Sequence, residues 1–440
     1  MNKKFNNNNI KSFNLKDIQI ELTRIMQEKI INDKILEKMT LDNVYKIFND
    51  NIFPMLNDEE VEYCQELESF CLELHPKIDK SKDVYVLFPE LGKHGYMQRI
   101  NKWRDFEPYG MKKEILLATI MSICDPQLEL ARLASGILCG NPTFQHGETS
   151  EILKVQDELM SGKEVGCIGI TEPERGSDAV NLTTTCTKVD DGIVFSGEKV
   201  FTTNGPKAKY FACYGVYDTE HPRQTMVQGM ISRDFGGIET KRLKINSVPR
   251  VQIAHTFLND VKVPMEYILG DNGGGYHNLF DGLVPERLGI MGSGVGICWA
   301  GLIYAIIYTN LRQQFGKNVI NYQGVGYSLG DLLSKVSAAT SLAFQAATIY
   351  DEKILFADKP SKQAEKWVAG ISSQGKYLLS KLTHEVCYEV QQQMGGVSVT
   401  DNTPVDELMD ISKIEEVIGG ARNIQLLILH GGLRRYSKIL

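Results

Sequence analysis

The chain has 440 residues, of which 42% are hydrophobic and 23% are charged. This length predicts two or three domains, and the composition excludes wholesale disorder and fibrous repeats. A net charge of −7 argues against nucleic acid as a general partner, because a polyanion would be repelled on average. The nine scattered cysteines form no CxxC pair, and the lysine-containing start lacks an apolar core, so we expect a cytoplasmic protein without disulfides.

The predicted elements divide the chain into three domains after an N-terminal extension over residues 1–40. From 41 to 163, apolar residues recur three and four positions apart, which predicts a helical domain. From 164 to 276, residues typical of strands alternate with turn pairs, which predicts a β-sheet domain. Polar and apolar residues alternate on both sides of Asp191-Gly192, which predicts a hairpin there. Helical spacing returns from 277 to 440. The sequence therefore predicts an α+β fold with a small sheet domain between two helical domains.

Residues 288–311 contain no charged side chain and are long enough to cross a bilayer as a helix. Five glycines and two alanines in this segment would let neighbouring helices approach closely, and the sequence has no second segment of this kind. We therefore predict a buried core helix and no membrane span. The GSGVG run at 292–296 resembles a dinucleotide fingerprint, but it lacks a preceding strand, so we interpret it as close helix packing.

Two stretches carry the most specific pattern, GCIGITEPERGSDAVNLTTT (166–185) and SGEKVFTTNG (196–205). A strand that ends in Thr171-Glu172-Pro173, followed by a turn at Gly176-Ser177-Asp178, presents hydroxyls and backbone amides beside small residues. This chemistry suits a flat heterocycle with a phosphate tail, because turn amides can bind pyrophosphate. A hairpin rich in turn residues explains the spacing equally well.

These stretches resemble the acyl-CoA dehydrogenase family, which carries TEP-x-x-GSD and, some twenty residues later, G-x-K-x-W/F-I/T-T-N-G. Further matches to the family follow in order: PERLG (285–289), RQQFG (312–316), Gln323, QQMGG (392–396), PVDELM (404–409) and GGARNIQ (419–425). The resemblance covers roughly residue 110 to the end. It implies an N-terminal helical domain, a middle β domain and a C-terminal four-helix bundle.

The resemblance implies FAD as the cofactor, and it offers no pattern for a metal site. Phe201 would stack on the flavin ring, and the Thr203 hydroxyl would face flavin N5. Thr171 would bond the pyrimidine edge, and Ser177 would reach the pyrophosphate. A second subunit would contribute further FAD contacts, namely Arg312, Phe315, Gln323, Gln392 and Gly396. The family therefore implies a homodimer, usually within a homotetramer.

Oxidation of an acyl thioester requires a carboxylate that removes the α-proton while hydride passes from the β-carbon to the flavin. Most family members place this glutamate directly before a Gly-Thr pair near the C-terminus, but the matching position here is Gly419. The isovaleryl- and long-chain-type branch places it on another helix, before an arginine, and that position is Glu286. The resemblance therefore implies Glu286 as the base, with the backbone N–H of Gly419 as a donor to the thioester carbonyl.

A structural role is the alternative for Glu286. It would sit at the start of a helix after Pro285, or pair with an arginine. If it is the base, enclosure by flavin and substrate should raise the pKa of its carboxyl. Arg287 is a candidate for binding the phosphate-bearing arm of the thioester, with a salt bridge as its alternative.

The leading hypothesis is an FAD-dependent dehydrogenase that forms an α,β-double bond in an acyl-CoA or an acyl thioester of a carrier protein. Electron-transferring flavoprotein is the acceptor expected from the family. Departures from the family pattern occur at Asp410-Ile411, Ala421 and residues 245–252. They leave two alternatives open, namely an oxidase or desulfinase-like elimination on the same fold, and a flavin-binding scaffold without catalysis.

Overall fold

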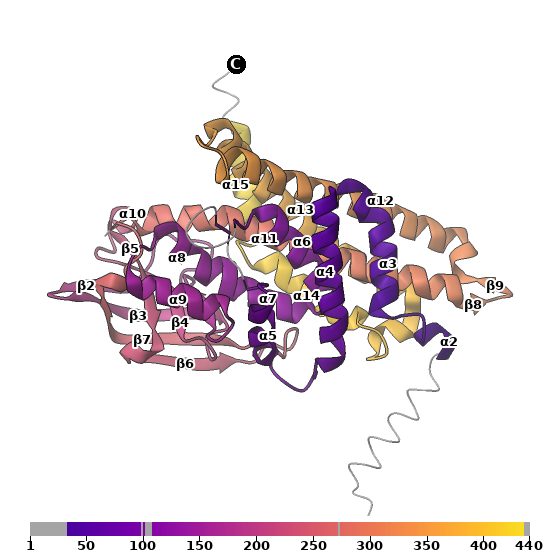
Figure 1. The fold of residues 1–440 in the computed structure, drawn as a ribbon, viewed down its shortest axis with the longest axis horizontal. Coiled ribbons are helices and arrows are strands. Elements are labelled where there is room, and N and C mark those ends of the chain that lie inside the picture. Colours follow the sequence, from indigo (N-terminus) through magenta and orange to yellow (C-terminus); the bar gives the residue numbers. More distant parts are fainter. Residues whose placement is uncertain (1–32, 98–99, 102–107, 272, 435–440) are drawn as a thin grey trace, which may run out of the picture.

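The computed structural model describes residues 33–97, 100–101, 108–271 and 273–434, so most of the predicted N-terminal extension lies outside the described residues. The molecule is elongated, with a β-sheet at one end and long helices that run from the sheet to the other end (Figure 1). The predicted α+β fold, with helices, then strands, then helices along the chain, is confirmed.

The described residues of the N-terminal part, from Asp33 to Met160, form mainly helices. Its helices are α2 (Asp33–Leu36), α3 (Leu41–Ile52), α4 (Asp58–Leu74), α5 (Phe88–Lys93), α6 (Met111–Cys124), α7 (Pro126–Leu133), α8 (Asn141–His146) and α9 (Ser150–Met160). Local signals define their ends. Asn57 and Glu60 form a reciprocal capping box at the start of α4, which satisfies two backbone N–H groups.

The middle part is a seven-stranded sheet with the order β1-β4-β2-β3-β7-β6, and β5 pairs with β4. The strands are β1 (Gly166–Gly169), β2 (Thr185–Val189), β3 (Gly192–Thr203), β4 (Tyr210–Val216), β5 (Met226–Ser232), β6 (Ile238–Leu243) and β7 (Ile253–Pro264), and the short helix α10 (Pro222–Thr225) precedes β5. β2 and β3 pair antiparallel from Val189↔Gly192 outward, which confirms the predicted hairpin.

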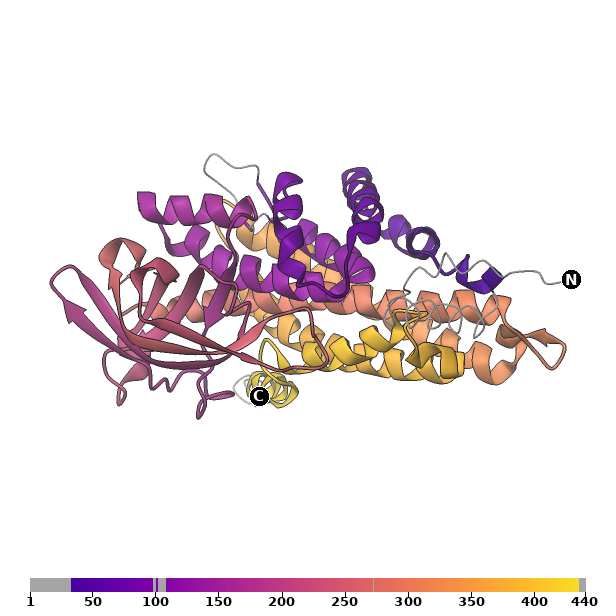
Figure 2. The same ribbon diagram turned by 90° about the horizontal axis from the view of Figure 1, so that it is seen from below.

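The C-terminal part is a bundle of long helices. It contains α11 (Gly275–Leu311), α12 (Gln323–Tyr350), α13 (Lys362–Met394), α14 (Val405–Val417) and α15 (Arg422–Arg434), with a small hairpin of β8 (Gln313–Gln314) and β9 (Lys317–Asn318) between α11 and α12. Figure 2 shows this hairpin at the end of the molecule opposite the sheet. α11 contacts α12, α13 and α14 of the bundle and also α6 of the N-terminal part.

Helix α11 is long and apolar enough to span a membrane, but 94% of its most apolar window is buried inside the protein. Two of its glycines, Gly292 and Gly296, face α6 at short range. A Cβ atom on Gly296 would lie 2.2 Å from the Thr119 carbonyl oxygen, and one on Gly292 would lie 2.9 Å from that of Ile115. These distances confirm both the predicted core helix and the interpretation of the GSGVG run as close packing.

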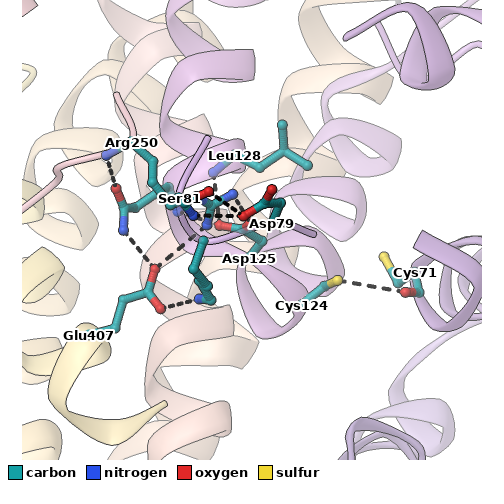
Figure 3. A network of polar contacts seen from close by, with 10 residues as sticks. Cys71, Asp79, Ser81, Cys124, Asp125, Leu128, Arg250 and Glu407 are labelled. Carbon is teal, nitrogen blue, oxygen red and sulfur yellow. Dashed lines mark hydrogen bonds and ion pairs between the residues drawn. The ribbon is translucent and has the colours of Figure 1, made fainter. Parts of the chain in front are cut away.

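Polar side chains join the three parts. Arg250, before β7, donates to Asp125 at the start of α7 over 2.7 Å, and its backbone N–H donates to the Gln127 side chain. Gln127 in turn donates to Glu407 of α14 over 2.6 Å. Figure 3 shows Asp125, Arg250 and Glu407 converging from three parts of the chain, and Lys80 also pairs with Glu407. The network fixes the sheet and the bundle relative to the N-terminal helices.

Candidate active site

The two predicted positions for the catalytic base meet in space. Glu286 projects from α11, and Gly419 lies in the turn between α14 and α15. A Cβ atom on Gly419 would lie 3.5 Å from Oε1 of Glu286 and only 2.4 Å from the side chain of Ile290. Gly419 and Gly420 both have positive φ, 59° and 86°, which glycine adopts without strain. The turn therefore excludes a side chain at 419, and the Glu286 carboxylate lies beside that position.

The carboxyl group of Glu286 is buried, with 9% of the residue exposed. Burial raises the pKa of this carboxyl to about 7, although the charges of Arg287 and Lys376 act in the opposite direction. This agrees with the raised pKa expected of a base in an enclosed site. The alternative of a helix-start residue is wrong, because α11 begins at Gly275 and Pro285 lies inside it.

Two further buried ionisable groups lie next to this site. Lys376 of α13 is fully buried, and its ammonium group donates to the carbonyl oxygens of Glu416, over 2.9 Å, and Gly420, over 3.1 Å. Glu415 of α14 accepts a hydrogen bond from Ser293, and burial raises the pKa of its carboxyl to about 7. Sequence reasoning missed Lys376 because it belongs to no quoted motif. The feature that could identify Lys376 from sequence is its position on the face of a predicted helix that the apolar residues place in the core.

Arg287 follows Glu286 on α11 and is also buried. Its guanidinium donates to the Ser373 hydroxyl of α13 over 3.3 Å, and burial lowers its pKa. Its contact with the phosphate-bearing arm of a substrate stays a prediction.

Phe201 stands out on the sheet because its large side chain is 64% exposed and its φ is 56°. Such a backbone conformation is costly for a bulky residue unless the surroundings impose it. Here the register of β3 and β7 shifts between Lys199 and Thr202, so the irregularity points the ring out of the sheet. An exposed aromatic ring held in this way fits the face of a flat heterocycle.

The other predicted residues of this group lie nearby. Thr171 follows β1, and its carbonyl oxygen accepts a hydrogen bond from Val200 over 2.8 Å, so the two motifs lie side by side. Thr203 is two residues beyond Phe201 at the end of β3, and Ser177 is exposed in the turn after Thr171. The structure thus brings Thr171 and Thr203 to the same region as the exposed ring, and their roles toward FAD stay predictions.

A buried ion pair holds the two motifs together. The Lys199 ammonium lies 2.7 Å from the Glu172 carboxylate, and both side chains are almost fully buried. Although burial alone would raise the pKa of Glu172, the Lys199 charge and hydrogen bonds from Thr183 and Thr184 lower it to about 2. Sequence reasoning quoted both residues within motifs but did not identify them as partners.

The second group of predicted FAD contacts lies at the far end of the bundle. The β8–β9 turn consists of Phe315 and Gly316, with φ of 51° and 83°, and Phe315 is 95% exposed. The start of α12 and the end of α13 are adjacent, because Gln393 donates to Ser328 over 3.3 Å. The group consists of Arg312, Phe315, Gln323, Gln392 and Gly396. Figures 1 and 2 show that this end lies opposite the sheet, so one chain does not bring the two groups together.

Comparison with known proteins identifies the family. Family models match residues 167–261 as an acyl-CoA dehydrogenase middle domain and residues 273–433 as an acyl-CoA dehydrogenase C-terminal domain, together more than half of the chain. A short-chain specific acyl-CoA dehydrogenase from Megasphaera elsdenii is 29% identical over 318 residues, which is 70% of this chain and 80% of the relative.

Two further proteins extend this likeness. The caffeyl-CoA reductase-Etf complex subunit CarC of Acetobacterium woodii is 26% identical over 297 residues, 67% of this chain and 75% of the relative. The solved structure of butyryl-CoA dehydrogenase from Megasphaera elsdenii superposes with a TM-score of 0.77 at 25% identity, over 86% of this chain and 98% of that chain.

The chain belongs to the acyl-CoA dehydrogenase family. Membership confirms the predicted family and fold class. At the level of the family, it also confirms the prediction of an FAD-dependent oxidoreductase that acts on CH–CH groups.

Proposed function

We propose that the protein is an FAD-dependent dehydrogenase that forms a double bond between the α- and β-carbons of an acyl thioester, with Glu286 as the base. One observation carries this proposal. The Glu286 carboxylate lies 3.5 Å from the point where a side chain at position 419 would begin, and the turn itself admits no side chain there. In this proposal, the carboxylate of Glu286 on α11 takes the position that a glutamate side chain at position 419 takes in most family members.

Glu286 and the Gly419 backbone have different roles in the proposed reaction. FAD, when bound, supplies the acceptor for the hydride that leaves the β-carbon. Glu286 takes the α-proton, and a pKa near 7 leaves much of its carboxyl ionised, yet basic, at neutral pH. The Gly419 N–H donates to the thioester carbonyl and stabilises the negative charge that develops on its oxygen.

The cofactor site that we propose is shared by two subunits. Thr171, Ser177, Phe201 and Thr203 bind the flavin and pyrophosphate from one copy. Arg312, Phe315, Gln323, Gln392 and Gly396 bind FAD from a second copy. The proposal is supported by the placement of the two groups at opposite ends of the molecule, each with an exposed phenylalanine at positive φ. A homodimer, within a homotetramer, is the assembly that completes the site.

We further propose coenzyme A or an acyl carrier protein as the carrier of the substrate, with Arg287 on its phosphate-bearing arm. Electron-transferring flavoprotein is the proposed acceptor, since the name of the relative CarC places that protein in an Etf complex. A cytoplasmic location belongs to the same proposal.

The test is anaerobic mixing of Glu286→Gln with butyryl-CoA and isovaleryl-CoA while flavin absorbance is followed. The variant should retain FAD and lose ~10²–10⁴-fold in the rate of flavin reduction, the usual contribution of a positioned base. Glu415→Gln is the matched control, because Glu415 is also buried and its pKa is also raised to about 7. Flavin reduction at the parental rate in Glu286→Gln, with loss in Glu415→Gln, would overturn the assignment.

A further inference from the structure

Lys376 is an unusual residue for the middle of a helical bundle. It lies on α13 with no exposed surface, among charged groups from two other helices. Transfer of an ammonium group from water to such a site is costly unless hydrogen bonds and opposite charges compensate. The compensation comes from residues of the proposed active site.

The ammonium group of Lys376 holds the glycine turn from one side. It donates to the carbonyl oxygens of Glu416, in the last turn of α14, and Gly420. From the other side, the buried Gln425 amide donates to the carbonyl oxygens of Gly419, over 3.1 Å, and Gly420, over 2.8 Å. These bonds fix the peptide planes of the turn. Within the described part of the chain, no group accepts a hydrogen bond from the Gly419 N–H.

We propose that Lys376 is a positioning residue of the active site, which orients the Gly419-Gly420 turn through its hydrogen bonds and supplies a positive charge next to the Glu286 carboxylate. This inference rests on the proposed function, in which the Gly419 N–H and the Glu286 carboxylate act on the same thioester. One side chain thereby links the donor that stabilises the developing negative charge with the base that removes the proton.

The charges around Lys376 support this assignment. Glu286 and Arg287 face it from α11, and Glu415 and Glu416 face it from α14. Burial lowers the pKa of Lys376 to about 8, and the acids act against this shift, so the group is largely protonated at neutral pH. Its charge in turn lowers the pKa values of Glu286 and Glu415, against the effect of burial.

Two neighbouring groups complete the electrostatic surroundings. Tyr214 of β4 faces Glu286 from the sheet side, and burial raises the pKa of its phenol, so it is neutral. Arg422 of α15 pairs with Glu416 over 3.2 Å at the edge of the cluster. Removal of the Lys376 charge therefore takes away one of the two cations that lower the pKa of Glu286, the other being Arg287, and the ionised form of Glu286 loses stabilisation.

Three variants separate the two roles. Lys376→Gln removes the charge, Lys376→Arg keeps it, and Gln425→Met removes two hydrogen bonds to the turn while it leaves every charge in place. For each, the rate of flavin reduction by butyryl-CoA is measured against pH, and kcat and KM are determined separately. The matched control is Lys335→Gln, an exposed lysine on α12 that pairs with Asp331 and Glu385.

We expect Lys376→Gln to move the midpoint of the pH profile upward by about one unit, since a nearby opposite charge shifts a carboxyl by that order. The kcat value should fall ~10-fold or more with little change in KM, because the lost stabilisation acts in the transition state. Lys376→Arg should restore the midpoint. Gln425→Met should lower kcat without moving the midpoint, and Lys335→Gln should change neither.

The outcomes are distinct. If parental flavin is not reduced by any thioester, the proposed function fails. If parental flavin is reduced and Lys376→Gln has the parental midpoint and kcat, only the role of Lys376 fails. If Lys376→Gln does not fold, the double variant Lys376→Gln/Glu415→Gln removes one charge of each sign, and its pH midpoint is compared with that of Glu415→Gln alone. An unmoved midpoint in that comparison also overturns the inference.

Discussion

Burial of the Glu286 carboxyl affects the folding free energy as well as the chemistry. The pKa rises from an ordinary 4.5 to about 7 in the folded protein. Between these values the native state binds more protons than the unfolded state, so the free energy of unfolding falls as the pH rises through this range. Ionisation of Glu286, which its role as a base requires, therefore lowers the free energy of unfolding.

This sign gives a prediction for Glu286→Gln, which cannot ionise. Its thermal unfolding midpoint should exceed the parental value above about pH 7, and the difference should shrink toward pH 4.5. Scanning calorimetry of both proteins over this range measures the effect. An exposed acid on α13 gives the control, since Glu365→Gln should show no such trend. A difference that grows as the pH falls would show that the carboxyl is stabilised, not destabilised, by its surroundings.

Sequence could predict Glu286 only through the family resemblance, because the residue has no local pattern of its own. What sequence could not supply is the contact between Glu286 and the turn at Gly419, since the two lie on α11 and after α14. Lys376 and the partnership of Lys199 with Glu172 were missed for the same reason. Each is a pairing of residues that are distant in sequence, so the partner of each residue is known only from the fold.

At the scale of elements, the turn of the β8–β9 hairpin holds a phenylalanine, Phe315, at a positive φ that is unfavourable for a bulky residue. Both residues of its two-residue turn have positive φ, which is typical of a type I′ turn. Glycine suits the second position, but phenylalanine at the first is unfavourable there. Because the ring is 95% exposed, it contributes little to the packing of its own chain. Retention of such a residue favours a contact outside the chain, and we propose FAD of a second copy.

Phe315→Asn tests this role, because asparagine tolerates positive φ and lacks the ring. We expect the variant to be at least as stable as the parent and to contain less FAD after purification. The ratio of flavin to protein absorbance and the thermal unfolding midpoint measure the two effects. Tyr327→Asn, on α12 and also exposed, is the control. Full FAD content in Phe315→Asn would contradict the proposed contact.

The elements that could be predicted were those with local signals. Helix α11 was predicted from its uncharged run, and the β2–β3 hairpin from its alternating pattern and turn. The strand order was not predictable, because β2 lies between β4 and β3, and β1 pairs in parallel with β4. Such pairings depend on contacts between distant segments, which hydrophobic spacing does not encode.

At the scale of the whole molecule, the network in Figure 3 joins the sheet, the N-terminal helices and the bundle through Arg250. The segment around it, residues 245–252, departs from the family pattern and had no interpretation from sequence. The structure gives it one. Arg250 is buried, and its ion pair with Asp125 lies where the three parts meet.

We predict that Arg250→Met destabilises the protein by ~3–5 kcal/mol, because it leaves the buried Asp125 carboxylate without its cationic partner. The free energy of unfolding from denaturant titration measures this. Lys80→Met is the control, since the Lys80 side chain is 61% exposed and an ion pair of an exposed lysine should contribute ~1 kcal/mol or less. Equal effects of the two substitutions would show that the buried pair does not join the domains.

The length of α11 has a consequence for genetics and for enzyme assays. Glu286 lies in the first half of this helix, and the C-terminal end of the helix leads directly into the hairpin that bears Phe315. If each FAD is completed by a neighbour, Glu286→Gln disables a subunit's own centre, whereas Phe315→Asn disables the neighbour's. Co-expressed, differently tagged subunits should then complement one another. A hybrid with one lesion on each chain keeps one intact centre and about half of the normal turnover, although both homodimers are defective. A hybrid as inactive as its parents would mean that the hairpin serves its own chain.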